Sequence, residues 1–211
     1  ANNMEILGKL FGTQERVKIM RLFLFSPDQA FDLADIALKT KSDLKAVRRE
    51  ISELGKINLI KSRIFFKEIN KGKEGDKKSD IVKKKTNGWI LDRTFPYLFE
   101  LQDLLINAQL IRHGEILKRL SNVGKLKAVN VSGVFIQDED SRVDMLIVGD
   151  NLKKNTVENA VKMIESEIGR EITYASFETP DFLYRLGMCD KLIRDILDYK
   201  HETIMDKIGI R

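Results

Sequence analysis

The spacing of apolar residues changes once in the first half of the chain, near residue 59. Before that point, apolar residues recur at helical spacing in three segments separated by short turns. After it, two runs rich in β-branched and aromatic residues, 59–67 and 88–92, flank a polar segment at 70–80. The sequence therefore predicts three helices followed by a β-hairpin with a long tip.

The three predicted helices carry recognisable end signals. Thr13 can cap the start of the first helix and Ser42 the start of the third, which ends near Gly55. The third helix has an apolar stripe formed by Leu44, Val47, Ile51 and Leu54. Three short helices separated by short turns match a helix-turn-helix core. Together with the hairpin they resemble a winged-helix DNA-binding domain over about residues 10–93. The resemblance implies that the third helix enters the major groove and that the hairpin touches the DNA backbone.

The net charge of +5 is unevenly divided along the chain. Residues 1–93 contain 21 Lys+Arg against 13 Asp+Glu, a net charge of +8, whereas residues 94–211 contain 16 against 19, a net charge of −3. This asymmetry favours a polyanion such as nucleic acid as the partner of the first part, because neutralising phosphates releases counterions. A solvated basic surface is the alternative interpretation.

The polar face of the third helix is the predicted DNA-contacting surface. Arginine can bind guanine O6 and N7 bidentately, so Arg48 and Arg49 are the candidates for base reading, whereas lysine and serine mainly position phosphate. The other candidates on this helix are Lys41, Ser42, Lys45 and Ser52. The hairpin adds the predicted phosphate contacts Lys77, Lys78, Lys83, Lys84 and Lys85. A solvated helix face and a solubilising loop are the alternatives, since acidic residues dilute the charge of the helix.

An apolar helical connector is predicted at residues 94–121. One side carries Leu98, Leu101, Leu105 and Ala108, and much of the remaining surface carries Phe99, Leu104, Ile106 and Ile111. A helix that is apolar on more than one side must be buried on more than one side. We expect either a homodimer across a two-fold axis, with DNA half-sites roughly 34 to 36 Å apart, or a helix sandwiched between two domains of its own chain.

The rest of the chain, residues 122–211, is predicted to form an α+β domain, which follows a winged-helix domain at 1–93 and the connector. The expected order is strand, strand, helix, strand, helix, with the helices at 155–168 and 180–199. The predicted strands contain Val129, Val131, and residues 143–148 and 172–177.

A turn and a strand in this part resemble the minimal nucleotidyltransferase fold of the DNA polymerase beta superfamily. That family places a Gly-Ser turn before a strand whose Asp-x-Asp presents two carboxylates to magnesium. Here Ser132 and Gly133 occur in reversed order, Arg142 stands where the first carboxylate belongs, and Asp144 matches the second. We therefore expect a vestigial site without transferase chemistry, in which the Arg142 guanidinium pairs with Asp144.

Residues that hold metals or form disulfides are scarce. The single cysteine, Cys189, and the two histidines, His113 and His201, predict no disulfide framework, no metal centre and no cofactor. Cys189 is expected in the core, in the middle of the last helix. No apolar run approaches the roughly 18 to 20 residues of a membrane span, so we expect a soluble, cytoplasmic protein with no membrane partner.

These features together predict a transcriptional regulator that binds double-stranded DNA. Its nucleotidyltransferase-like domain would be catalytically degenerate and act as a sensor for a small molecule or nucleotide, or as an assembly surface. Two alternatives stay open. One is an active, antitoxin-like nucleotidyltransferase targeted by the winged helix, and the other is an adaptor whose winged helix contacts protein instead of DNA.

Overall fold

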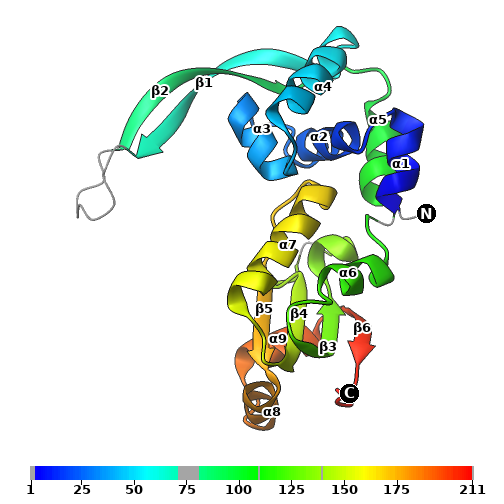
Figure 1. Cartoon of the computed structure of the whole chain (residues 1–211), viewed down its shortest axis with the longest axis vertical. Helices are drawn as coiled ribbons and strands as arrows, with labels where there is room; N and C mark the ends of the chain where they lie inside the picture. The colour runs from blue at the N-terminus through cyan, green and yellow to red at the C-terminus, as the bar shows by residue number, and fades with distance from the viewer. Residues whose placement is uncertain (1–2, 71–80, 109, 139, 211) are drawn as a thin grey trace.

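The computed structural model describes residues 3–70, 81–108, 110–138 and 140–210, and it has the predicted α+β composition (Figure 1). Its first part contains four helices and a two-stranded antiparallel hairpin. These elements are α1 (Asn3–Phe11), α2 (Gln14–Phe25), α3 (Leu33–Thr40), α4 (Leu44–Lys56), β1 (Ile60–Asn70) and β2 (Ile81–Leu91). Helices α2 to α4 and the presence of a hairpin match the sequence prediction, but β2 begins at Ile81, well before the predicted strand at 88–92, and α1 was not predicted.

The starts of α2 and α4 test the two predicted caps. The Thr13 side chain accepts a hydrogen bond from the Arg16 amide, as predicted. The prediction for α4 is wrong by one residue, because Asp43 is its cap and accepts from the amides of Lys45 and Ala46. A carboxylate at this position also interacts favourably with the positive end of the helix dipole.

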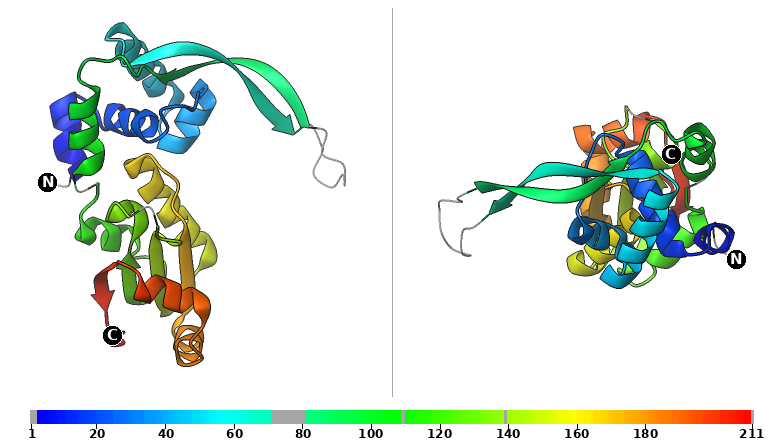
Figure 2. Two further views of the ribbon diagram at one scale, coloured as in Figure 1. Left: turned by 180° about the vertical axis from the view of Figure 1, so that it is seen from behind. Right: turned by 90° about the horizontal axis from the view of Figure 1, so that it is seen from above.

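The base of the hairpin is fastened to the helices by a short β-bridge. Phe31, just before α3, exchanges two backbone hydrogen bonds of 2.9 Å with Trp89 of β2. Gly88 is required beside this bridge, because a Cβ atom there would lie 2.4 Å from the Phe31 carbonyl oxygen. Beyond its base the hairpin extends away from the rest of the molecule (Figure 2).

The connector is shorter and less regular than predicted. It consists of α5 (Leu98–Gln102), the π-helical turn η1 (Asp103–Asn107) and α6 (His113–Arg119). Leu105 is fully buried, and Leu98, Leu101 and Ile106 pack against the core of the first part. Helix α5 lies beside α1 (Figure 1), but none of its residues is buried.

The last part of the chain is a four-stranded sheet with helices on both faces. Its elements are β3 (Lys125–Val131), η2 (Gly133–Phe135), β4 (Met145–Asp150), α7 (Lys154–Ile168), β5 (Tyr174–Glu178), α8 (Thr179–Gly187), α9 (Lys191–Asp198) and β6 (Glu202–Asp206). The strand order is β5-β4-β3-β6, with β4 and β5 parallel and the other pairs antiparallel. Alternate β4 residues face opposite layers: Ile147 packs in the cluster with α6 and α7, and Leu146 in the cluster with α8 and α9.

The predicted helix at 180–199 is in fact two helices. The chain turns at Cys189, whose φ angle is 55°, and Asp190 then caps α9 by accepting from the amides of Leu192 and Ile193. Cys189 is exposed, so the predicted core position is wrong. The edge strand β6 was also missed, because its five residues lack a regular apolar alternation.

The first and last parts of the chain meet where α2 packs against the end of α7. Arg21 of α2 is 1% exposed, and its Nε donates to the Leu105 carbonyl (3.0 Å) while its Nη1 donates to the Glu167 carbonyl (2.9 Å). Burial lowers the pKa of Arg21 to about 10, against the attraction of the Glu167 carboxylate. A Cβ atom at Gly169 would lie 2.7 Å from the Arg21 backbone. The two parts are therefore packed against each other as well as joined by the connector.

Within the described residues, none of the helices is both long enough and apolar enough to span a bilayer.

Candidate nucleic-acid interface

Helix α4 presents a basic face to solvent. The predicted contacts on α4 itself, Lys45, Arg48, Arg49 and Ser52, are exposed. Lys41 and Ser42 were predicted on this helix but precede it, and Lys41, the C-cap of α3, is exposed. Ser42 is half-buried, and its hydroxyl donates to the Thr40 carbonyl (3.3 Å). The opposite side of the helix is anchored by Val47, Ile51 and Leu54, which are at most 3% exposed. Leu44 departs from the predicted apolar stripe because it is 41% exposed, at the first turn of the helix.

Of the two arginines on this face, only Arg49 is bound by a buried carboxylate. The Glu50 side chain has no solvent exposure, and it accepts hydrogen bonds from Arg16 Nε (2.7 Å) and Arg49 Nη2 (3.0 Å). Burial alone would raise the pKa of Glu50, but the hydrogen bonds from Arg16 and Arg49 hold it below its ordinary value. No acidic group of the described residues pairs with Arg48. The Arg48 guanidinium is therefore available to bind a partner, whereas the Arg49 guanidinium is partly occupied by Glu50.

Sequence reasoning treated Glu50 only as a residue that dilutes the charge of α4. Its position three residues after Val47 and four before Leu54 was the signal, because these spacings place it on the buried side of the helix. A buried carboxylate needs a cationic partner, and Arg16 supplies it from α2.

The hairpin adds a second exposed basic surface. Lys83, Lys84 and Lys85 of β2 are exposed, and Lys83 lies 3.9 Å from the Glu68 carboxylate across the ladder. Arg63 of β1 is also exposed, although the sequence prediction omitted it. Strand alternation does not single it out, because residues 61–64 are all exposed. The predicted contacts Lys77 and Lys78 lie outside the described residues.

Lys67 of β1 is held by two carboxylates. Its Nζ contacts Asp32 (2.9 Å) and Asp35 (2.6 Å) at the start of α3. Burial opposes its positive charge, but the hydrogen bonds to these two carboxylates raise the pKa of Lys67. This pair of contacts ties the hairpin to α3 and so to the helices that support α4.

The predicted vestigial site is brought together only in part. Ser132, Gly133 and Asp144 lie side by side, because the Ser132 amide donates to the Asp144 carbonyl (2.8 Å). The Asp144 carboxylate accepts from the amides of Val134 (2.9 Å) and Thr173 (2.8 Å). Gly133 has a φ angle of 55°, and a Cβ atom there would lie 2.0 Å from an Asp144 carboxylate oxygen. The Asp144 carboxylate thus links the turn at residues 132–134 to Thr173, which directly precedes β5.

The expected pairing of Arg142 with Asp144 is wrong. Arg142 is directed to α9, where its Nη1 lies 2.6 Å from an Asp195 carboxylate oxygen. The prediction assumed that Arg142 and Asp144 belong to one strand, in which alternate side chains share a face. Strand β4 begins only at Met145, so that alternation does not apply to them.

The histidines, the cysteine and the acidic residues are dispersed. Among the described residues, no three His, Cys, Asp or Glu side chains are grouped so that they could hold a metal ion. His113 Nε2 lies 2.9 Å from a Glu202 carboxylate oxygen, and His201 Nδ1 lies 2.9 Å from the Tyr199 carbonyl.

Comparison with known proteins gives no relative from which a function could be transferred. No protein-family model matches the chain, and no curated protein and no solved structure matches it. Function must therefore be argued from the residues of the chain itself.

Proposed function

We propose that this chain is a winged-helix transcriptional regulator that binds double-stranded DNA through α4 and the hairpin. One observation carries the proposal: α4 has a row of exposed cations, including Lys45 and Arg48, on the side opposite its anchor in the core. A helix held in this way can present side chains to the major groove without rearranging. The exposed lysines 83–85 of the hairpin are suited to phosphate contacts.

The contacts of the two arginines suggest different roles. Arg48 is proposed to read a guanine, because its five donors are not committed to an acidic partner in the described structure. Arg49 would act mainly as a positioning cation, because Glu50 already binds its Nε and Nη2.

Selection of binding sites from random DNA tests this function. We expect the full-length chain to enrich a sequence motif, and the double variant Arg48→Ala, Arg49→Ala to lose that selectivity. A matched control removes two exposed cations from α9, Lys191→Ala with Arg194→Ala, and should retain the motif. Absence of any enriched motif, or wild-type selectivity in the Arg48/Arg49 variant, would reject the recognition-helix assignment.

The C-terminal part is proposed to be a degenerate nucleotidyltransferase-like domain. The alternative of an active transferase is favoured by the juxtaposition of Ser132, Gly133 and Asp144, but the Asp144 carboxylate is occupied by two backbone amides. A labelled-nucleotide transfer assay with magnesium and ATP distinguishes them. We expect no incorporation, and incorporation that Asp144→Ala abolishes would favour the transferase.

We also propose that the protein forms a homodimer through α1 and α5. These neighbouring helices and the turns around them expose Ile6, Leu10, Tyr97, Phe99 and Leu104. Phe99 is 74% exposed and Leu10 is 66% exposed, and a second copy of the same surface is the simplest cover for such residues. Sedimentation equilibrium at micromolar concentration should give twice the mass of one chain, and Phe99→Glu should give a monomer. A wild-type mass near 24.3 kDa would contradict the dimer.

A further inference from the structure

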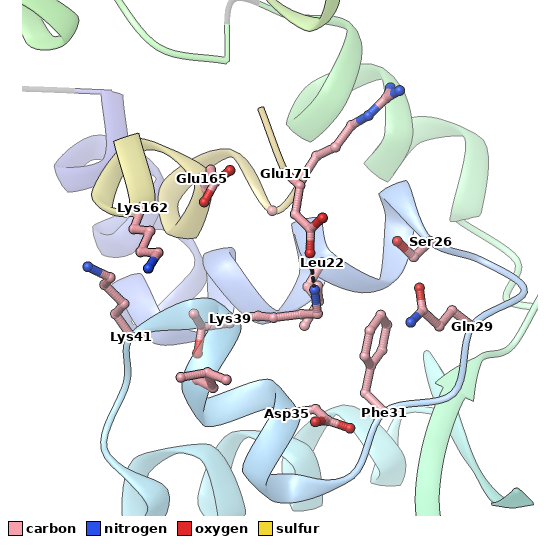
Figure 3. A pocket seen from close by; sticks show the side chains of 14 residues that line it. Leu22, Ser26, Gln29, Phe31, Asp35, Lys39, Lys41, Lys162, Glu165 and Glu171 are labelled. Atoms are coloured by element: carbon pink, nitrogen blue, oxygen red, sulfur yellow. Dashed lines mark hydrogen bonds and ion pairs between the residues drawn. The ribbon is translucent and has the colours of Figure 1, made fainter. Parts of the chain in front are cut away.

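A cavity of about 630 Å³ lies where the first and last parts of the chain meet. One wall comes from α2, α3 and the segment between them, and the other from the end of α7 and residues 169–171 (Figure 3). Cavities of roughly 300 to 1,000 Å³ are typical of small-molecule sites. This volume is therefore sufficient for a small organic ligand.

The side of the cavity formed by α2, α3 and the segment between them includes three apolar residues among polar ones. Leu22 and Phe31 contribute to it from the core, and Leu38 is 77% exposed at its margin. An exposed leucine beside a cavity gains stability when an apolar group covers it. The ligand is therefore expected to have an apolar body.

The acidic side chains around the cavity are more completely paired than the basic ones. Each of its three acidic side chains has a partner: Asp35 contacts Lys67 (2.6 Å), Glu171 contacts Lys39 (2.8 Å), and Glu165 accepts from the Ile172 amide (2.8 Å). The acids of the cavity wall are thus already neutralised or hydrogen-bonded.

The cations at one end of the cavity are less completely paired. In Figure 3 the side chains of Lys41 and Lys162 extend toward the same end from opposite walls. Lys162 contacts Glu158 (2.7 Å), whereas no carboxylate in the described part of the chain pairs with Lys41. Burial lowers the pKa of the neighbouring Lys18, and the charge of Lys41 acts in the same direction. A negatively charged group at this end would be stabilised by both walls.

We propose that this cavity binds a small organic anion whose apolar body covers Leu38 and whose negative group lies between Lys41 and Lys162. Such a ligand would contact both parts of the chain at once. Of the predicted DNA contacts within the described residues, only Lys41 lines this cavity, and the proposal holds whether or not the chain binds DNA.

Anilinonaphthalene sulfonate is a suitable probe, because it combines an apolar aromatic body with one negative charge. Its fluorescence is titrated with the full-length protein, without DNA, for the wild type and three variants. Leu38→Asp removes the apolar margin, Lys162→Glu reverses one cation, and Lys154→Glu makes the same charge change on an exposed residue of α7 outside the cavity. Circular dichroism checks that each variant is folded. Leu38→Asp is expected to fold, because Leu38 is exposed.

We expect saturable binding of one probe molecule per chain. Leu38→Asp and Lys162→Glu should each weaken it about tenfold, and Lys154→Glu should bind like the wild type. Equal binding by all four proteins would place the probe on another apolar surface and overturn the proposal. Absence of saturable binding to the wild type would overturn it as well.

Discussion

Two regions attract attention in the sequence because of their polar and charged residues, the basic face of α4 and the turn around Asp144. In the folded chain they differ in what their charged groups contact. On α4, Lys45 and Arg48 are exposed, and the side chains that fix the helix lie on its other side. At the turn, the Asp144 carboxylate is bound to the amides of Val134 and Thr173.

This difference shows why residue type alone does not define a site. A charged group can act on a partner only if its hydrogen-bonding capacity is not already used within the fold. The basic face of α4 retains that capacity and the Asp144 turn does not. The predictions below test this contrast, from the largest expected effect to the smallest.

The largest effect is expected in the salt dependence of DNA binding. If six to ten phosphates are contacted, affinity should fall by roughly a thousandfold or more between about 50 and 200 mM salt. Fluorescence anisotropy with the selected DNA measures it, and Asp144→Asn should show the same slope as the wild type. An affinity for DNA that does not change with salt concentration would mean that the basic face is an ordinary solvated surface.

Removing the Asp144 carboxylate should damage the fold and not DNA recognition. Asp144→Ala leaves the amides of Val134 and Thr173 without their acceptor, and hydrogen bonds to charged groups contribute about 1.5 to 3 kcal/mol. We expect the free energy of unfolding in urea to fall by about 3 kcal/mol. Asp144→Asn, which retains one acceptor oxygen, should lose less. An unchanged stability in both variants would mean that the carboxylate is not structural.

The two arginines of α4 should differ in their contribution to binding. Arg48→Ala is expected to cost about 1 to 3 kcal/mol of binding free energy and to relax one base preference. Arg49→Ala should cost less, because Glu50 already engages its guanidinium. Lys84→Ala should weaken all DNA sequences alike. Equal specificity losses for Arg48→Ala and Arg49→Ala would contradict the roles assigned from the contacts of Glu50.

The pH dependence of stability should reveal the buried carboxylate of α4. Because the folded-state pKa of Glu50 is held below its ordinary value of 4.5, its stabilising contribution is complete above about pH 4.5 and is lost as the pH falls through the folded pKa. Between pH 3 and 7, the midpoint temperature of thermal unfolding should therefore fall less steeply at the acid end for Glu50→Gln than for the wild type. Parallel curves for the two proteins would contradict this assignment.

The smallest effect is expected for the ion pair between Arg142 and Asp195. The Arg142 side chain is 62% exposed, and exposed pairs contribute at most about 1 kcal/mol. Arg142→Ala should lower the free energy of unfolding by no more than that amount, and it should leave nucleotide transfer undetectable. Appearance of transferase activity would mean that Arg142 blocks an otherwise competent site.

The elements with the strongest periodic pattern were predicted well. Helix α4, strand β1 and helix α7 have apolar patterns that depend mainly on local spacing, so the sequence indicated all three, whereas only the end of β2 was predicted. Strand β6 was missed because it is short and pairs with β3, which is distant in sequence. Helix α1 was missed although it packs on α2, the next element along the chain. The break at Cys189 was missed because a left-handed residue other than glycine has no strong local signal.

The sequence by itself determined the α+β class, the concentration of positive charge in residues 1–93 and the solvent-facing residues of α4. These properties follow from composition and from the period of apolar residues, which act locally. Only the tertiary structure decided which charged groups stay available. It buried Glu50 against Arg16, turned Arg142 toward Asp195 and formed the cavity beside Lys41. Such pairings join residues far apart in the chain, and no local pattern specifies which partner comes close enough to form a bond.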